Sequence, residues 1–239
     1  MSPKWQFGLL LLLIALVNVA AGYLTSDESS PSGWALVPLL LTIVLLIQCF
    51  AVIGRLPPLN DWRGVLIDQR NKISLSRLQL VVWSILVISA AITYGTLNAM
   101  WGQPHALDLS IPKELWILLG ISTGSFVAAP LVLGTKDDAL DVNPENEHPW
   151  RDIFYGDDKG NSDRVDFSKV QQFFFTIVLV IVYAVSVGAV LLRATSIPGN
   201  GPGPVLIFPP LDAGFIGIMA VSQTAYIAYK AMPQSKTDA

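Results

Sequence analysis

The sequence predicts an all-α membrane protein with six transmembrane helices and with both termini in the cytoplasm. Of its 239 residues, 52% are hydrophobic and only 14% are charged, whereas a soluble domain has roughly 25% charged residues. The apolar residues gather in uncharged runs, and about 20 such residues suffice to cross a bilayer as a helix. Lysine and arginine fall almost entirely on one side when the runs are threaded through a membrane, which fixes the orientation.

The predicted spans follow one another with short loops outside and longer loops inside. The order of spans suggests an N-terminal hairpin in residues 1–57 and two further two-helix segments in residues 58–136 and 137–239. The first span follows Lys4 and precedes the small residues Ala20 and Ala21, a pattern that also fits a cleaved signal peptide, but we expect this helix to be retained. The six expected spans are Phe7–Tyr23, Trp34–Gly54, Leu80–Trp101, Leu115–Gly134, Phe173–Leu192 and Ala213–Ala231.

The distribution of basic residues supports this threading. With the N-terminus inside, only Lys113 and Arg193 lie outside, and the other 13 of the 15 basic residues lie inside. An excess of Lys and Arg in short cytoplasmic loops is the usual determinant of orientation. The long inner loop of residues 135–168 is also dense in acidic residues.

Two stretches of the chain repeat each other. Ser76-Arg77-Leu78-Gln79 and Ser168-Lys169-Val170-Gln171 each begin an apolar run, and a second run then carries Gly120-Ile121 or Gly217-Ile218. A Trp-Arg pair precedes each copy, at Trp62 and at Trp150. Each copy holds two spans, so both begin and end on the cytoplasmic side and the repeats are parallel. Many transporters use inverted repeats instead, so the parallel sense weakens the case for a transporter without excluding it.

The repeated Ser-x-x-Gln motif predicts a helix cap at the membrane surface. The hydroxyl of Ser76 or Ser168 would accept from a backbone N–H, and the amide of Gln79 or Gln171 would reach back. Arg77 and Lys169 would extend their charges toward the headgroups. An anion or lipid-phosphate site at these helix starts is the alternative, because helix N-termini attract anions.

Small and polar residues concentrate in the second span of each copy. They favour close packing of the fourth span against the sixth, because small side chains let helix backbones approach and polar ones bridge between them. The alternative is a polar seam that lines a pore or binds a ligand, with Gln223 as its most telling member. The residues concerned are Gly120, Ser122, Thr123, Gly124, Gly217, Ser222 and Gln223.

The sequence offers little catalytic chemistry. No ionisable residue lies deep in a predicted span, and His105 and His148 fall on opposite sides. The run from Asp157 to Asp163 does not fit the EF-hand pattern, and a solvated acidic turn is expected there. No phosphate loop or nucleophile elbow is found in the sequence. We therefore expect no enzyme activity, cofactor or metal, and the net charge of −3 gives no reason to expect a nucleic-acid partner.

Several of these motifs resemble a family of uncharacterised bacterial inner-membrane proteins. The similar residues are Ile73-Ser74-Leu75-Ser76-Arg77-Leu78-Gln79 with Trp83, Leu118-Leu119-Gly120-Ile121-Ser122-Thr123, and Ser222-Gln223-Thr224-Ala225-Tyr226 before Lys230. The second copy departs from the family pattern at Lys169, where the first has Arg, and at Phe175, in the place of Trp83. The resemblance implies location in a bacterial inner membrane and carries no activity with it.

The sequence thus favours a non-catalytic scaffold or accessory subunit of a membrane complex. Its partners would be the lipid bilayer together with other membrane subunits or further copies of itself. An oligomeric ion channel or pore-forming effector is the alternative, and a small-molecule transporter ranks third.

Overall fold

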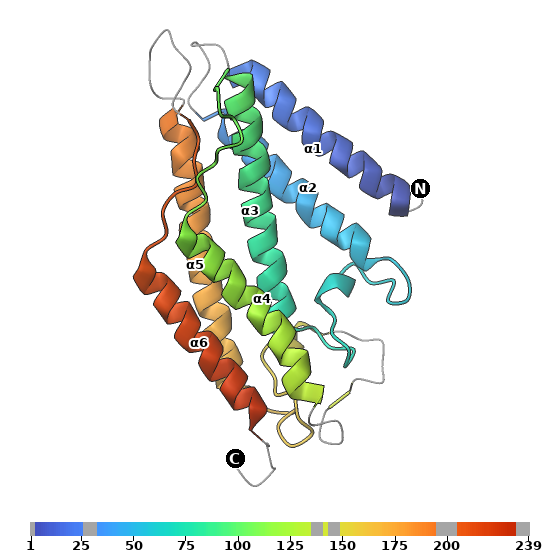
Figure 1. Ribbon diagram of the computed structural model, residues 1–239. Coiled ribbons are helices and arrows are strands. Elements are labelled where there is room, and N and C mark those ends of the chain that lie inside the picture. The colour runs from blue at the N-terminus through green and yellow to red at the C-terminus, as the bar shows by residue number, and fades with distance from the viewer. Residues whose placement is uncertain (1–2, 26–32, 135–140, 143–148, 195–204, 233–239) are drawn as a thin grey trace. The chain divides into compact units, whose positions relative to one another are not determined.

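The computed structural model describes residues 3–25, 33–134, 141–142, 149–194 and 205–232 (Figure 1). Within these ranges the chain forms α-helices, two short 3₁₀ helices and two isolated β-bridges, and no β-strand longer than a bridge. The predicted all-α fold class is therefore confirmed. The α-helices are α1 (Pro3–Thr25), α2 (Leu36–Gly54), α3 (Leu75–Met100), α4 (Lys113–Gly134), α5 (Phe167–Ala194) and α6 (Ala213–Ala231), and the 3₁₀ helices are η1 (Gly64–Leu66) and η2 (Trp150–Ile153).

Five of these helices are long and apolar enough to cross a membrane, namely α1 to α5. They indicate a multi-pass membrane protein. Helix α6 has 19 residues and forms where a span was expected, but it is not among the five. Its crossing of the membrane stays a prediction.

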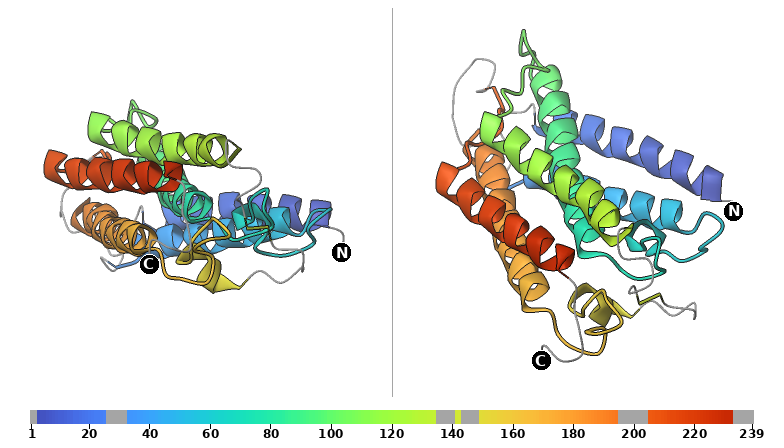
Figure 2. Two further views of the ribbon diagram at one scale, coloured as in Figure 1. Left: turned by 90° about the horizontal axis from the view of Figure 1, so that it is seen from below. Right: turned by 60° about the horizontal axis from the view of Figure 1, so that its bottom comes forward.

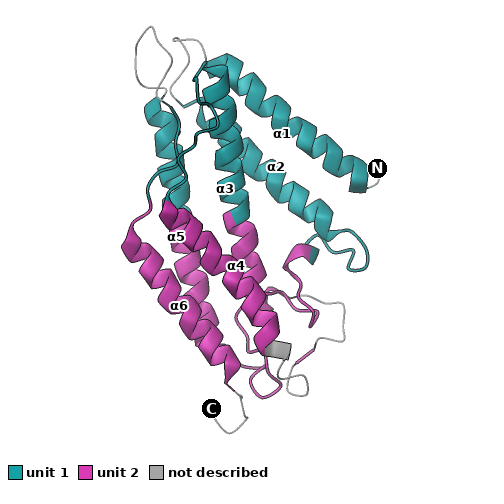
Figure 3. Ribbon diagram, in the orientation of Figure 1, with its two compact units in different colours: residues 1–64, 84–112, 181–210 teal, residues 65–83, 113–180, 211–239 magenta. Residues whose placement is uncertain are grey.

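The chain packs into two compact units, shown in different colours in Figure 3. Unit 1 comprises residues 1–64, 84–112 and 181–210, and unit 2 comprises residues 65–83, 113–180 and 211–239. Helices α3 and α5 contribute residues to both. The three sequence segments 1–57, 58–136 and 137–239 are contiguous and describe the order of the spans, whereas each unit draws on several stretches of chain.

In unit 1, α1 and α2 lie side by side and run in opposite directions (Figures 1 and 2). A buried polar contact joins them, in which Asn18 Nδ2 donates to Thr42 Oγ1 at 2.8 Å. The same amide donates to the carbonyl of Ile14 at 2.9 Å. Polar side chains in apolar helices need such partners, because lipid supplies none. The pair therefore fixes the register of the two helices.

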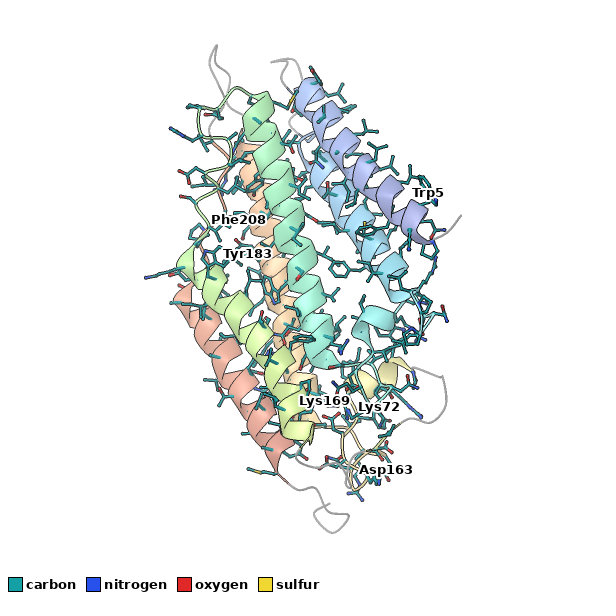
Figure 4. All side chains as sticks on the ribbon, turned by 45° about the vertical axis from the view of Figure 1, so that its right-hand side comes forward. Trp5, Lys72, Asp163, Lys169, Tyr183 and Phe208 are labelled. Atoms are coloured by element: carbon teal, nitrogen blue, oxygen red, sulfur yellow. The ribbon has the colours of Figure 1, made fainter. Side chains whose placement is uncertain are left out.

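The described C-terminal part of unit 1 is held by side chains of α3 and α5. Tyr94 donates from its hydroxyl to the carbonyl of Val187 at 2.7 Å, and its ring lies 5.7 Å from that of Phe208. Tyr183 donates to the carbonyl of Pro209 at 3.3 Å, and Figure 4 shows Tyr183 and Phe208 near each other. These contacts attach the extended segment of residues 205–210 to the helices.

We expect Asn98→Leu to loosen this attachment. Asn98 is fully buried, accepts from the backbone N–H of Leu206 at 2.8 Å and donates to its carbonyl at 3.0 Å. The leucine would leave both backbone groups of Leu206 unpaired, at a cost of about 1–3 kcal/mol. Thermal unfolding of the detergent-solubilised protein should show a lower midpoint, and an unchanged midpoint would contradict this account.

In unit 2, α4 and α6 lie side by side and run in the same direction (Figures 1 and 2). The predicted contact of the fourth span with the sixth is therefore present. The first turns of α3 lie on a small apolar core made with the preceding loops, whose buried members are Leu66, Ile67, Ile73, Leu75 and Ile153.

The segments before α3 and α5 share a local structure. Each has a 3₁₀ helix close to a Trp-Arg pair and then a single antiparallel bridge, between Ile67 and Ile73 in one case and between Tyr155 and Val165 in the other. The long helix follows directly in both. The second hairpin carries Asp157, the residue around which the site below is built.

Candidate functional site

The first turn of α3 does not form the predicted capping box. Helix α3 begins at Leu75, so Ser76 lies inside the helix, and the backbone N–H of Leu78 is bonded to the carbonyl of Ser74 at 3.0 Å. Ser76 Oγ is buried without a hydrogen-bond partner. Gln79 is 1% exposed and bonds to other helices. The capping-box interpretation is therefore wrong here, because the interior of unit 2 takes up the polar side chains that would serve as caps.

The cap of α5 also differs from the prediction. Asp166 Oδ1 accepts from the backbone N–H of Ser168 at 2.9 Å, from its hydroxyl at 2.6 Å and from the backbone N–H of Lys169 at 3.4 Å. A carboxylate at this position satisfies free N–H groups and also favours the positive end of the helix dipole. Ser168 thus donates to the capping residue, and Asp166 provides the cap in place of the expected Ser168 and Gln171.

The two basic residues of the motif also differ from each other. Arg77 is half-buried and lies over the ring of Phe126, with its guanidinium carbon 5.6 Å from the ring centre. Lys169 is only 3% exposed. The expectation that Lys169 extends toward headgroups is wrong, because its ammonium group is bound within the protein.

Three glutamines and a serine meet in the interior of unit 2, and we call these four residues the glutamine cluster. Gln79 of α3 accepts through Oε1 from Gln172 Nε2 of α5 at 3.3 Å and from Gln223 Nε2 of α6 at 2.5 Å. Ser125 of α4 donates to Gln223 Oε1. All four side chains are at most 4% exposed. Each helix of the unit thus contributes one polar side chain to a shared contact.

The glutamine cluster retains hydrogen-bonding capacity that is not used inside it. Gln79 Nε2 and Gln172 Oε1 are buried without a partner, as is the hydroxyl of Ser222 on α6. Buried polar groups without partners cost free energy. The cluster therefore favours arrangements in which these helices stay together, because separating them would expose still more polar groups to lipid.

A buried ion cluster lies at the end of unit 2 where α5 begins and α6 ends. Its centre is Asp157, whose Oδ1 lies 2.6 Å from Arg70 Nη1 and 2.8 Å from Lys169 Nζ. Asp157 Oδ2 lies 2.9 Å from Lys230 Nζ. Asp68 adds a second carboxylate, 2.7 Å from Arg70 Nη2. The ion cluster, defined as Asp68, Arg70, Asp157, Lys169 and Lys230, thus holds three cations and two carboxylates.

Further contacts tie the ion cluster to its surroundings. Lys169 Nζ donates to the carbonyl of Tyr155, and Lys230 Nζ donates to the hydroxyl of Tyr226 at 2.9 Å. Outside the cluster, Lys72 Nζ lies 2.5 Å from Asp141 Oδ2. Figure 4 shows Lys72 and Lys169 at the same end of the unit. The segments that precede α3 and α5 are thereby fastened to each other, to the start of α5 and to the end of α6.

The surrounding charges determine the protonation of Asp157. Burial alone would raise the pKa of this carboxyl, but the positive charges of Lys169, Lys230 and Arg70 hold its pKa well below the ordinary value. Burial would likewise lower the pKa of Arg70, and the negative charges of Asp157 and Asp68 raise it instead. Asp157 and Arg70 are therefore both ionised near neutral pH. The expectation of a solvated acidic turn is wrong for Asp157, which is 6% exposed.

The predicted small-residue contacts are divided between two faces. Ser122, Ser222 and Gln223 are buried, and Gln223 accepts from Ser125 of α4. Gly120, Gly124 and Gly217 are exposed, and a Cβ added at any of them would meet no atom within 4 Å. Thr123 is exposed as well. The contact of α4 with α6 therefore uses the hydroxyl and amide residues rather than the glycines.

Comparison of the chain with protein-family models, with curated proteins and with solved structures finds no match. The family resemblance drawn from the sequence motifs thus stays a prediction. The site must be interpreted from its own geometry.

The arrangement is suited to holding helices and loops together. The three cations of the ion cluster are all paired, and the glutamines of the glutamine cluster bond to one another and to Ser125. Within the described ranges no group of three His, Cys, Asp or Glu side chains could hold a metal ion. The sequence patterns singled out Gln79, Lys169 and Gln223 as functional candidates. They predicted other contacts for them than those in the structure. They missed Arg70, Asp157, Gln172 and Lys230. The signal for the three charged residues was a high density of charge beside helix ends, and no pattern in the sequence distinguished Gln172 from Gln171.

Proposed function

We propose that the protein is a non-catalytic scaffold or accessory subunit in a bacterial inner membrane. The observation that carries the proposal is the glutamine cluster. The polar side chains that α3, α4, α5 and α6 contribute to it bond to one another. Polar residues of a transport path must instead remain available to the transported species. The interior of unit 2 is thus built for packing.

The ion cluster supports the same proposal. It fastens loop residues to α5 and α6 through buried charges, so this end of unit 2 presents a fixed surface. Accessory subunits bind their partners through such surfaces, because little conformational freedom is lost on association. In the proposed threading this end faces the cytoplasm, with six spans and both termini inside. The acidic residues Asp137, Asp138, Glu145 and Glu147 of the same loop lie outside the described residues.

The exposed small residues supply a contact for neighbouring helices. Gly120, Thr123 and Gly124 form a patch on α4 that no described residue covers closely, as the open space around both glycines shows. Small residues on a lipid-facing helix allow another helix to approach at short range. We therefore assign this patch to association with other subunits or with further copies of the chain.

The pore interpretation receives less support. It requires Ser122 and Gln223 to face a water-filled path, whereas they are 0% and 4% exposed. Gln223 is bonded on both sides, to Gln79 and to Ser125. A pore lined by these residues would need the glutamine cluster to separate.

Flux and assembly measurements on one preparation test the proposal. Liposomes that contain the purified protein should release no more trapped dye or ions than protein-free liposomes. Native mass spectrometry of gently solubilised membranes should show a complex of fixed composition. Gly120→Leu and Gly217→Leu should both weaken that complex without lowering thermal stability, because each site has room for a side chain. Gly8→Leu is the matched control, since Gly8 also lies in open space on an exposed helix face.

Two outcomes would count against the scaffold. Dye release that Gln223→Leu abolishes would establish the pore instead. A complex that survives both glycine substitutions unchanged would remove the role given to the exposed small residues of α4 and α6.

A further inference from the structure

A groove lies between α1 and α2 in unit 1, at the end where α1 begins and α2 ends. Its volume is about 300 Å³, which is at the lower end of the range for small-molecule sites, roughly 300–1,000 Å³. Leu9, Leu10, Ala51 and Val52 form its apolar part. The small side chain of Ala51 leaves space there, whereas the bond between Asn18 and Thr42 draws the helices together further along.

Three polar side chains complete the lining. They are Gln6 of α1, Gln48 of α2 and Arg55, which follows the last residue of α2. The groove therefore has an apolar part and an amide- and guanidinium-bearing part. Amides can donate to and accept from ester or phosphate oxygens, and guanidinium binds phosphate oxygens with charge-assisted hydrogen bonds.

The charge at this end of the unit is positive. The side chains of Lys4 and Arg55 are exposed, and among the described residues no carboxylate lines the groove. The nearby Asp61 forms an ion pair with Arg63 at 2.8 Å. A ligand with an apolar chain and a negative headgroup would match both parts of the groove.

The membrane setting selects among such ligands. Both helices are long and apolar enough to span a bilayer, and Trp5, at the free end of α1 in Figure 4, is 75% exposed. Exposed tryptophans gather at the level of lipid headgroups. Gln6 and Arg55 would then lie near phosphates, and Leu9 and Leu10 about 4.5–6 Å deeper, at a rise of ~1.5 Å per residue.

We propose that this groove binds one anionic phospholipid of the surrounding leaflet. Its phosphate contacts Arg55, its ester region contacts the amides of Gln6 and Gln48, and the upper part of one acyl chain lies against Ala51 and Val52. The remainder of the chain follows the exposed apolar surface of the two helices. The site is independent of the clusters in unit 2 and of the scaffold function.

Native mass spectrometry of the full-length protein in detergent tests this proposal. The probes are phosphatidylglycerol, phosphatidylcholine and inorganic phosphate, each added separately. Phosphatidylglycerol should be retained more strongly than phosphatidylcholine, and phosphate alone should not bind. Arg55→Gln should weaken retention of phosphatidylglycerol about fivefold, the effect of one basic residue at an anionic surface. Arg193→Gln, at the exposed far end of α5, is the matched control and should have no effect.

A second pair of variants tests the apolar part. Ala51→Phe should fill the groove and reduce retention of both lipids, whereas Leu41→Phe, at an exposed position of α2 outside the groove, should not. Thermal unfolding confirms that each variant is folded. Equal retention of the two lipids, equal effects of the two arginine variants, or unchanged retention in Ala51→Phe would overturn the proposal. Binding of phosphate alone would replace the lipid by a simple anion.

Discussion

Asp157→Asn is expected to cause a large loss of stability in unit 2. The amide would leave Arg70, Lys169 and Lys230 buried around a neutral group, with Asp68 as the only remaining carboxylate of the ion cluster. Removing one partner of a buried ion pair costs about 3–5 kcal/mol, because the other charge stays desolvated. Thermal or denaturant unfolding of the solubilised protein should show this loss.

A matched control lies in the same loop. Asp163 is exposed, and Figure 4 shows it at the same end of unit 2 as Lys169. Asp163→Asn makes the same chemical change without removing a buried charge, so its effect should stay within about 0.5 kcal/mol. Adding Lys169→Met to Asp157→Asn should restore part of the lost stability by removing one uncompensated cation. Equal stability of the two asparagine variants would contradict the role of the cluster.

The same carboxylate predicts how stability depends on pH. The pKa of Asp157 is lower in the folded protein than in the unfolded chain, where it is about 3.9. A lowered pKa means that the folded state binds a proton less readily, so the contribution is complete above this unfolded value and falls as pH drops below it toward the folded pKa. Below about pH 4 the unfolding free energy of the native protein should decline more steeply than that of Asp157→Asn. Parallel curves would contradict the assignment.

Gln79→Leu is expected to destabilise unit 2 as well, though less than Asp157→Asn. Gln79 Oε1 is the shared acceptor for the amide groups of Gln172 and Gln223. Leucine is similar in size but accepts nothing, so two buried donors would lose their partner at a cost of about 1–3 kcal/mol. Hydrogen bonds between transmembrane helices average about 0.6 kcal/mol in double-mutant cycles, which favours the lower part of this range. Unfolding of the solubilised protein measures the change.

Gln171→Leu distinguishes two interpretations of the repeated Ser-x-x-Gln motif, as a capping box or as part of the buried glutamine cluster. The sequence pairs Gln171 with Gln79 as equivalent caps, whereas the structure places Gln172 in the glutamine cluster and leaves Gln171 half-buried outside it. We expect Gln171→Leu to change the unfolding free energy by less than about 0.5 kcal/mol. Equal losses for the two leucine variants would favour the capping box.

The helices themselves could be predicted because long uncharged runs have few alternatives in a membrane. The expected starts of the third and fifth spans, Leu80 and Phe173, nevertheless fall five and six residues after the actual starts at Leu75 and Phe167. Absence of charge marks the part of a helix that can lie in hydrocarbon, not its first hydrogen-bonded turn. Both helices run on through Arg77 and Lys169 because protein groups contact these cations.

The partners of the site residues could not be predicted in the same way. Asp157 and Asp163 belong to one acidic run, yet only the first is buried. That difference depends on Arg70 and Lys230, which lie 87 residues before and 73 residues after Asp157. The residues next to Asp157 in the sequence do not indicate that these distant residues will contact it. The same reason explains why Gln172, and not the predicted Gln171, lies in the glutamine cluster. Long-range packing decides which face of α5 is turned inward.

The ion cluster also has a consequence for the folding of the protein during its synthesis. Arg70, Asp157 and Lys169 are all present once the ribosome has passed the start of α5, but Lys230 lies in the last turn of α6. Until α6 has been synthesised and has packed against α4, Asp157 Oδ2 lacks its ion-pair partner. The ion cluster is therefore completed only after α6 has formed, and a product truncated before Lys230 would lack one of the three cations around Asp157.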